Sequence, residues 1–185
     1  MSRRSLGAGG PTTTPRHTLE LRTLGRATLC RDGAEAEDIV HQSKRFALLV
    51  YLAVAAPGGF HRRDTILSLF WPDLSEKRAR NALNKALHFL RFHLGSEVVE
   101  SRGSVEVGLK ADSVWCDAVA YQEAYEGGRL GEAVELYGGP FLEGFHVSEA
   151  AEFEHWVDRQ REHFEQRYSA ALQELALAAA DRNDL

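Results

Sequence analysis

The pattern of apolar and polar residues over residues 43–94 predicts three helices of different character. Residues 43–56 are apolar on nearly every side, which is typical of a central buried helix. Residues 62–70 and 75–94 are apolar on one face only, and Trp71-Pro72-Asp73 separates them. We therefore expect a buried helix followed by two amphipathic helices.

Short strands are expected on both sides of these helices. Weak alternation over His17–Arg31 predicts two strands joined at Gly25, with a turn at Asp32-Gly33. Ile39-Val40 is a further candidate strand, and Ser43 stands where it would cap the next helix. A β-hairpin is predicted over residues 98–109. Val105, Val107 and Leu109 alternate with other residues, and Arg102-Gly103 form the tight tip.

The helix expected over residues 75–94 has two distinct faces. At about 100° per residue its inward face holds only apolar side chains, and these are Ala79, Leu83, Ala86, Leu87, Leu90 and Leu94. Polar and basic side chains lie opposite, and these are Lys77, Asn81, Asn84, Lys85 and His88, with Arg78, Arg80 and Arg91 at the margins. Gly95 is placed to end the helix. Strands, three helices and a hairpin follow one another in the order of a winged helix with an N-terminal β-sheet.

After residue 111 the pattern changes to helices alone. Helices are expected over Asp117–Glu126, Leu130–Tyr137 and Ala150–Asp181, with glycines between them. Stacked helical pairs of this kind form TPR-like repeats that bury a shared core. We expect domains over residues 17–110 and 111–185, the second an incomplete part of a longer helical array, and a disordered tail over residues 1–16.

The charge is distributed unevenly, so the acidic net charge of the whole chain does not exclude binding to nucleic acid. The whole chain carries a formal charge of −5, but residues 1–110 hold 17 Lys and Arg against 11 Asp and Glu, a net +6. Residues 111–185 hold 5 basic against 16 acidic side chains, a net −11. A basic front part favours nucleic acid, and an acidic back part favours protein partners.

Several classes of function have no support in the sequence. No apolar run approaches the roughly 20 residues of a membrane span, and the N-terminus has no signal-peptide core, so we expect a cytoplasmic protein without a membrane partner. Cys30 and Cys116 form no CxxC motif. His155 and His163 are two helical turns apart, too far to share one metal ion. Neither a P-loop nor a GxSxG motif occurs, so we expect no enzyme, no cofactor and no metal.

Ordered sequence blocks over most of the chain resemble one bacterial family. The first four are LRTLG, QSKRFALLVYLA, HRRDTILSLFWPD and ARNALNKALHFLR. The later ones are VWCDAVAYQEA, LYGGPFLEGF and EFEHWVDRQRE. Together they resemble the OmpR-type winged helix and the bacterial transcriptional activator domain of SARP-type activators. The resemblance implies promoter DNA and RNA polymerase as partners, recruitment of the polymerase, nucleoid association, and a helical domain that aids homodimer formation.

The polar face of the helix over residues 75–94 is the expected DNA-reading surface. In a winged helix this helix enters the major groove. Asn81 and Asn84 are the expected base readers, with adenine as the favoured partner of asparagine. The other expected contacts, mostly to phosphates, are Lys77, Arg78, Arg80, Lys85, His88, Arg102 at the wing tip, and Lys44 and Arg45 at a helix start. The family's helix is often richer in arginine, so the preferred DNA sequence does not follow from the resemblance.

Two alternatives remain open at this point. Trp71 and Asp73 lie in the loop that can contact RNA polymerase in OmpR-type domains, but the favoured interpretation of Trp71 is a packed side chain that fixes the turn. The runner-up function is a protein-interaction module, in which the winged helix binds no DNA and the acidic helices provide the docking surface.

Overall fold

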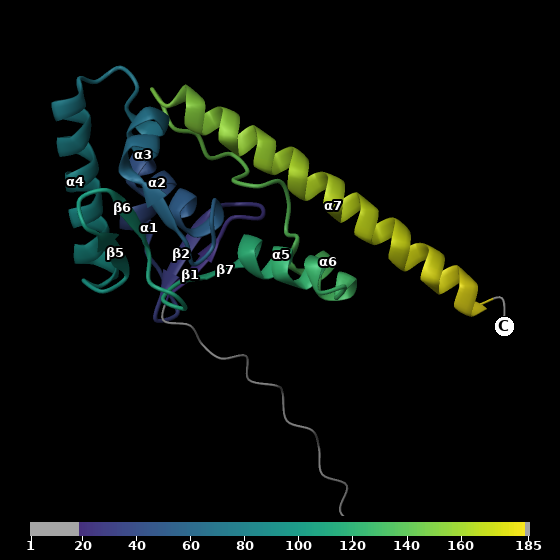
Figure 1. The fold of residues 1–185 in the computed structure, drawn as a ribbon. Coiled ribbons are helices and arrows are strands. Elements are labelled where there is room, and N and C mark those ends of the chain that lie inside the picture. Colours follow the sequence, from purple (N-terminus) through teal and green to yellow (C-terminus); the bar gives the residue numbers. More distant parts are fainter. Residues whose placement is uncertain (1–18, 184–185) are drawn as a thin grey trace, which may run out of the picture.

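The computed structural model describes residues 19–183, in which a β-sheet and a winged helix are followed by helices (Figure 1). The expected disordered tail over residues 1–16 lies outside the described residues. The first sheet has the strand order β3-β2-β1-β7. Its strands are β1 (Leu19–Arg22), β2 (Thr28–Arg31), β3 (Ala34–Glu35) and β7 (Trp115–Cys116). The expected fold class, an N-terminal sheet and winged helix followed by helices, is confirmed.

The first two strands form where the alternation predicted them. Leu19 and Leu21 point into the core, and β1 pairs antiparallel with β2. Asp32 and Gly33 both adopt positive φ, which gives the tight turn between β2 and β3. The fourth strand, β7, pairs parallel to β1 and was not predicted, since two residues are too short to show a pattern.

Four helices follow in the winged helix: α1 (Glu37–Val40), α2 (Ser43–Val54), α3 (Arg63–Phe70) and α4 (Glu76–Leu94). The predicted strand at Ile39-Val40 is wrong. These residues belong to α1, and burial of Ile39 from a helical turn explains its apolar character. Ser43 is the first residue of α2 rather than its cap, because Gln42 occupies that position.

The two faces of α4 agree with the predicted ones. Its buried residues are the six apolar ones of the expected stripe, Ala79, Leu83, Ala86, Leu87, Leu90 and Leu94. Ser75 stands before the first turn, although its side chain makes no capping hydrogen bond. Gly95 follows the last turn with φ of 116°, a value that favours glycine.

The wing is a three-stranded sheet in the order β4-β6-β5, formed by β4 (Phe60–Arg62), β5 (Val99–Arg102) and β6 (Glu106–Leu109). The predicted hairpin supplies β5 and β6, while β4 was not predicted. Val107 and Leu109 are buried as expected, but Val105 is exposed. The connection occupies residues 103–105, so Val105 lies in the turn instead of on the inner face of a strand.

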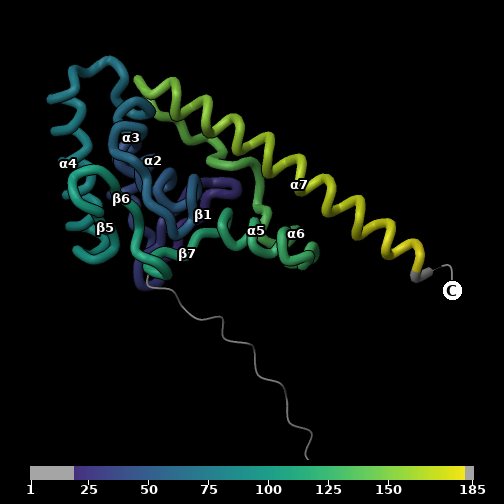
Figure 2. The backbone as a smooth tube through the Cα atoms, in the orientation of Figure 1, coloured from purple at the N-terminus to yellow at the C-terminus, as the bar shows by residue number. Residues whose placement is uncertain are grey.

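The remaining helices are α5 (Asp117–Glu126), α6 (Leu130–Leu136) and α7 (Ala151–Asn183). The first part of α7 packs against α3, where Phe153 meets Phe70, and its middle part packs against α6, where Tyr168 meets Tyr137. The C-terminal part of α7 extends away from the rest of the molecule (Figure 2). Leu172 and Leu177 on that part are exposed. Across residues 19–183 no helix combines the length and the apolar character needed to cross a membrane.

One hydrophobic core joins the winged helix to the later helices. It extends from Leu19 to Phe164 without a break between the two parts. Phe70 of α3 faces Phe153 of α7 with ring centroids 5.0 Å apart, and Tyr51 of α2 meets Trp156 at 5.2 Å. Aromatic pairs at these distances contribute beyond the area that they bury. The division into domains at residue 110 stays a prediction, and the two parts pack on each other closely.

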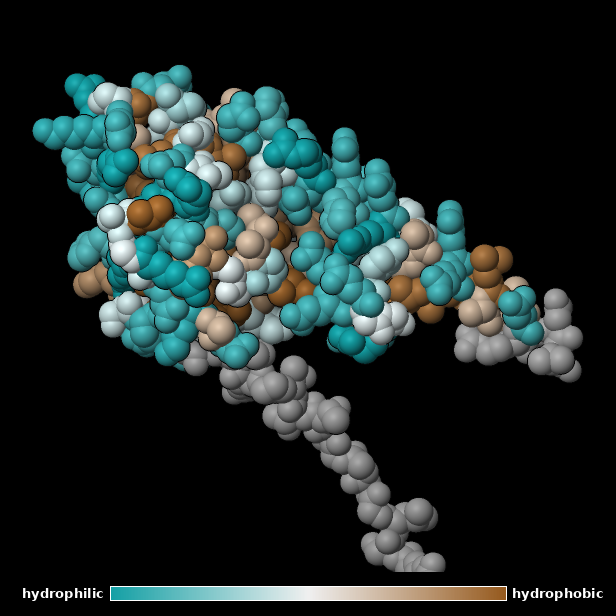
Figure 3. All heavy atoms as spheres, viewed as in Figure 1, coloured by the Kyte–Doolittle hydropathy of each residue, from teal (hydrophilic) through white to brown (hydrophobic). Residues whose placement is uncertain are grey.

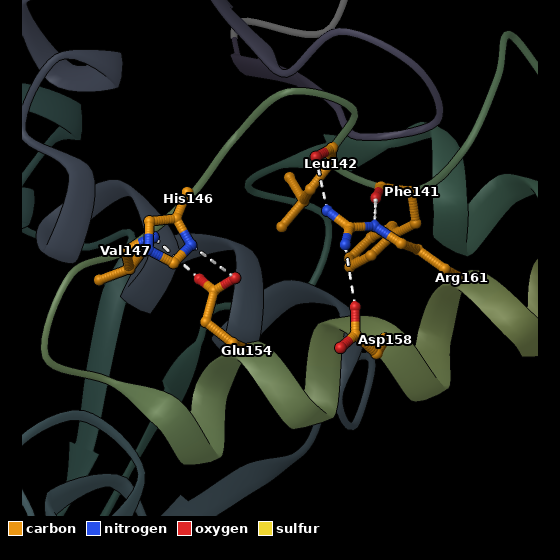
Figure 4. A network of polar contacts seen from close by, with 7 residues as sticks. All are labelled: Phe141, Leu142, His146, Val147, Glu154, Asp158 and Arg161. Atoms are coloured by element: carbon orange, nitrogen blue, oxygen red, sulfur yellow. Dashed lines mark hydrogen bonds and ion pairs between the residues drawn. The ribbon is translucent and has the colours of Figure 1, made fainter.

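Polar contacts also hold α7 to the loop before it (Figure 4). The Arg161 guanidinium donates to the Phe141 carbonyl at 2.9 Å and to the Leu142 carbonyl at 3.1 Å, and it pairs with Asp158. Glu154 accepts a hydrogen bond from the backbone nitrogen of Val147 at 2.8 Å. This loop in turn bonds to the end of β1, since the Leu142 nitrogen donates to the Thr23 carbonyl at 2.7 Å.

Candidate nucleic-acid interface

The outward face of α4 carries the side chains that the sequence singled out. Each of them is exposed: Lys77, Arg78, Arg80, Asn81, Asn84, Lys85 and His88. The view in Figure 3 shows mostly hydrophilic side chains over this end of the molecule, where α4 and the wing lie together in Figure 1. A helix with a polar outer face beside a β-hairpin is the arrangement with which winged helices approach a duplex.

Asn84 is held by an arginine that the sequence analysis did not select. Nη1 of Arg63, at the start of α3, donates to Oδ1 of Asn84 at 2.9 Å. Nη2 of the same guanidinium lies 3.4 Å from the Ser101 hydroxyl on β5. Arg63 therefore connects α3, α4 and the wing.

Arg91 also joins α4 to the wing, and it contacts the same Ser101 hydroxyl as Arg63. Its Nη2 donates to Ser101 Oγ at 3.0 Å, and its Nε donates to the Val99 carbonyl at 3.1 Å. Burial lowers the pKa of Arg63, and the neighbouring charges of Arg91 and Arg80 lower it further. The clustered guanidinium groups make the junction between α4 and the wing positive, which suits a polyanion.

Arg80 is partly neutralised by two carboxylates. Its Nη2 lies 2.8 Å from Glu76 Oε1, one turn earlier on α4, and 3.6 Å from Asp64 Oδ1 on α3. The side chain is still 53 % exposed, so it can reach a phosphate only in competition with these partners. A phosphate contact at Arg80, as the sequence predicted, would therefore have to displace Glu76 and Asp64 from the guanidinium.

Several of the predicted residues line one surface hollow of about 610 Å³, formed by Arg45, Asn84, Lys85, His88, Phe89 and Phe92. The Arg45 guanidinium lies over the Phe89 ring, 4.3 Å from its centroid. The structure thus brings Arg45 from α2 onto the same surface as the polar face of α4. Phe92 is 78 % exposed, which is unusual for so large an apolar side chain.

Lys44 does not share that surface. Its Nζ lies 3.3 Å from the backbone carbonyl of Glu149, just before α7, and the side chain is half-buried. The adjacent residues Lys44 and Arg45 were expected to act together at the start of α2. In the structure Lys44 faces the later helices and Arg45 faces α4.

Arg102 lies at the end of β5, next to the turn of the wing. Its guanidinium lies over the Phe60 ring of β4, 3.7 Å from the centroid. The side chain remains exposed. Stacking on Phe60 keeps the charge at the end of the wing while leaving the edge of the guanidinium open to a partner.

The loop between α3 and α4 has one packed and one open side chain. Trp71 is half-buried beside Phe70, with ring centroids 5.7 Å apart, and Asp73 is exposed. The Trp71 ring also lines a shallow hollow with Pro72 and Leu74. Trp71 therefore packs and remains accessible, so both expected roles stay open.

Metal ligands do not gather in the part of the chain that the structure describes: no three His, Cys, Asp or Glu side chains there form a group that could hold an ion.

The residues missed by the sequence analysis are Arg63, Arg91 and Ser101. The sequence placed Arg91 only at the margin of the polar face of α4. Arg63, Arg91 and Ser101 lie on three separate elements, so no local sequence pattern indicates that they meet.

One of three comparisons with known proteins supports the fold. A scan against protein-family models and a search of curated proteins found no match for this chain. A solved structure described as Mycobacterium tuberculosis EmbR in complex with a low affinity phosphopeptide superimposes with a TM-score of 0.59 at 18 % sequence identity. The match covers 89 % of this chain and 48 % of EmbR, so this chain spans about half the length of that protein. Nearly the whole chain therefore has an EmbR-like fold.

Proposed function

We propose that this chain binds double-stranded DNA through α4 and the wing and regulates transcription. The observation that carries the proposal is the outward face of α4, where Asn81 and Asn84 stand among Lys77, Arg78 and Lys85. Asparagine contacts base edges in the major groove, and lysine and arginine contact phosphates. A solvated helix surface alone would not need a wing attached to it through Arg91 and Arg63.

The uneven charge supports this proposal. A net charge of −5 would oppose binding to DNA, but residues 1–110 carry +6 and contain α4 and the wing. The negative charge belongs to the helices after residue 111. Phosphate neutralisation by the basic part releases counterions from the duplex, and this supplies affinity for any DNA sequence.

We further propose that the protein activates transcription by recruiting RNA polymerase, with the Trp71 and Asp73 loop as the contact. The loop is open to solvent at Asp73, and Trp71 presents part of its ring in a shallow hollow. Promoter DNA and the polymerase would then be the two partners, and the helical part would contribute to a homodimer. The EmbR-like fold is compatible with this assignment, which rests on the exposed side chains.

A mobility-shift experiment with the full chain tests DNA binding directly. Duplexes selected from a randomised library are measured at about 50 mM and about 200 mM salt, a range over which several phosphate contacts change affinity strongly. We expect salt-sensitive binding, with the Asn81→Ala variant losing about 1–3 kcal/mol on the selected site but little on unrelated duplexes. The exposed Gln166→Ala variant on α7 is the control. Salt-insensitive or absent binding would reject the proposal.

A second function, docking of a protein on the winged helix, is favoured by one observation. Phe92 is 78 % exposed beside Phe89 on α4, and such an apolar surface is typical of protein contacts. In that case no duplex would bind with salt sensitivity, and the acidic helices would also serve as a docking surface. The same mobility-shift experiment separates the two functions.

A further inference from the structure

The contact between Arg63 and Asn84 determines which atoms of the Asn84 amide remain available. A guanidinium has hydrogen-bond donors only, so the amide atom 2.9 Å from Arg63 Nη1 has to be the acceptor Oδ1. The Nδ2 group is then turned away from Arg63. Asn84 is exposed, so its two N–H donors are open to a partner in front of α4.

Arg63 is itself held in place, which makes this orientation a property of the fold. Its side chain is half-buried, and its backbone nitrogen donates to the Val105 carbonyl at 2.8 Å. Its Nη2 shares the Ser101 hydroxyl with Arg91. The buried Nε of Arg63 has no hydrogen-bond partner among the described residues. The side-chain hydrogen bonds of the Arg63 guanidinium are therefore those of Nη1 with Asn84 and Nη2 with Ser101.

We propose that Asn84 reads DNA as a hydrogen-bond donor and that Arg63 is the positioning residue that imposes this choice. The inference rests on the proposed DNA-binding function and specifies its base preference. The usual asparagine contact with adenine needs Oδ1 to accept from N6 while Nδ2 donates to N7. Here Oδ1 faces Arg63, and moving it to adenine would break the 2.9 Å bond.

Guanine is the base that fits an outward pair of donors. Its major-groove edge presents two acceptors, N7 and O6, whereas cytosine presents a donor. We therefore expect guanine opposite Asn84 and discrimination against cytosine. This preference differs from adenine, which the asparagine side chain alone would suggest.

The experiment determines the base preference of the full chain and its variants by sequencing duplexes bound from a randomised library. The Asn84→Ala variant identifies the base pair read by Asn84, since preference is lost there. We expect the wild-type chain to prefer guanine at that position by about tenfold over the other bases, the ratio that one good contact of about 1.4 kcal/mol provides.

Two variants then test the role of Arg63. Arg63→Met keeps the length of the side chain but removes its donors, so Oδ1 becomes free and the preference shifts from guanine towards adenine. Arg62→Met is the matched control, because it removes the same charge from a neighbouring residue that is exposed. Asn84→Asp keeps an acceptor towards Arg63 but turns an oxygen outward, so the preference shifts towards cytosine, whose N4 is a donor. A carboxylate has no donors, so this variant tests that residue 84 contacts the base. If Arg63→Met does not fold, the wild-type preference for guanine over adenine still tests the orientation of Asn84.

The outcomes distinguish this inference from the proposed function. A wild-type preference for adenine, or an unchanged preference in Arg63→Met and Asn84→Asp, overturns the role of Arg63 while DNA binding stands. Loss of overall affinity in Arg63→Met without a change of preferred base means that Arg63 holds the wing and does not set the base. If the wild-type chain selects no duplex, DNA binding fails and the inference fails with it.

Discussion

The carboxylate of Asp117, the first residue of α5, accepts hydrogen bonds from the backbone nitrogen of Thr23 at 2.7 Å and from its hydroxyl at 2.9 Å. The two residues are 94 positions apart. The same carboxylate also accepts from the backbone nitrogens of Leu24 and Ala118. One buried side chain thus joins the first strand to the helices that follow the wing.

Removal of the Asp117 carboxylate should strongly destabilise the protein. Asp117→Ala leaves several buried donors without a partner, and we expect the free energy of unfolding to fall by about 3 kcal/mol or more. Thr23→Val removes only the contacts of the hydroxyl, with Asp117 and more weakly with the Cys116 sulfur, and should cost about 1 kcal/mol. Urea unfolding measures both, with the exposed Glu123→Ala variant on α5 as the control. Equal stability of Asp117→Ala and Glu123→Ala would contradict the role of this junction.

Arg161 should contribute to stability through the loop before α7. The Arg161→Ala variant removes the Arg161 donors from the Phe141 and Leu142 carbonyls, although the Leu142 carbonyl still accepts from the Phe145 nitrogen at 3.1 Å. We expect a loss of about 1–3 kcal/mol. The exposed Arg159→Ala variant removes the same charge from the same helix and should stay within about 0.5 kcal/mol of the wild type. Thermal unfolding followed by circular dichroism compares the two variants. A similar loss in both would point to net charge instead of the carbonyl contacts.

His61 should make the protein less stable in mild acid. The ring is buried against Tyr51, with centroids 4.9 Å apart, and burial lowers its pKa below the ordinary 6.5, against a smaller raising effect of a backbone contact with Leu52. The unfolded chain therefore takes up this proton first. The stabilisation is complete above about pH 6.5 and is lost as the pH falls towards the folded-state pKa.

A comparison with His61→Phe isolates this effect from the other histidines. The variant retains an aromatic ring beside Tyr51 but has no proton to bind. Urea unfolding between pH 8 and pH 5 should show a steeper loss of stability in the wild type than in the variant. Parallel curves would show that His61 does not contribute to the pH dependence.

Two basic residues of α4 should differ in their contribution to salt-dependent DNA binding. Lys85→Ala removes an exposed charge and should reduce the slope of log K against log salt by about one unit. Arg80→Ala should reduce it by less, because Glu76 and Asp64 already compete for that guanidinium. Fluorescence anisotropy of a labelled duplex over a salt series measures both slopes. A larger reduction for Arg80 would show that the carboxylates release it on binding.

The sequence alone determined the elements whose side chains repeat over several turns or along a strand. The apolar stripe of α4 from Ala79 to Leu94 fixed which side of that helix faces the core, since six buried positions at helical spacing leave little alternative. Val107 and Leu109 similarly indicated the inner face of the wing. Ile39-Val40 misled because two apolar residues fit a strand and a single helical turn equally well.

Only the tertiary structure decided how these elements meet. Strands β4 and β7 have two or three residues each, and their identity comes from the partners with which they pair. Arg63, Asn84 and Ser101 lie on three different elements, so their shared hydrogen bonds depend on how α3, α4 and the wing pack together. The sequence placed Asn84 on the outer face of α4, whereas the fold determined that its oxygen faces Arg63, because long-range contacts leave no periodic signal in the chain.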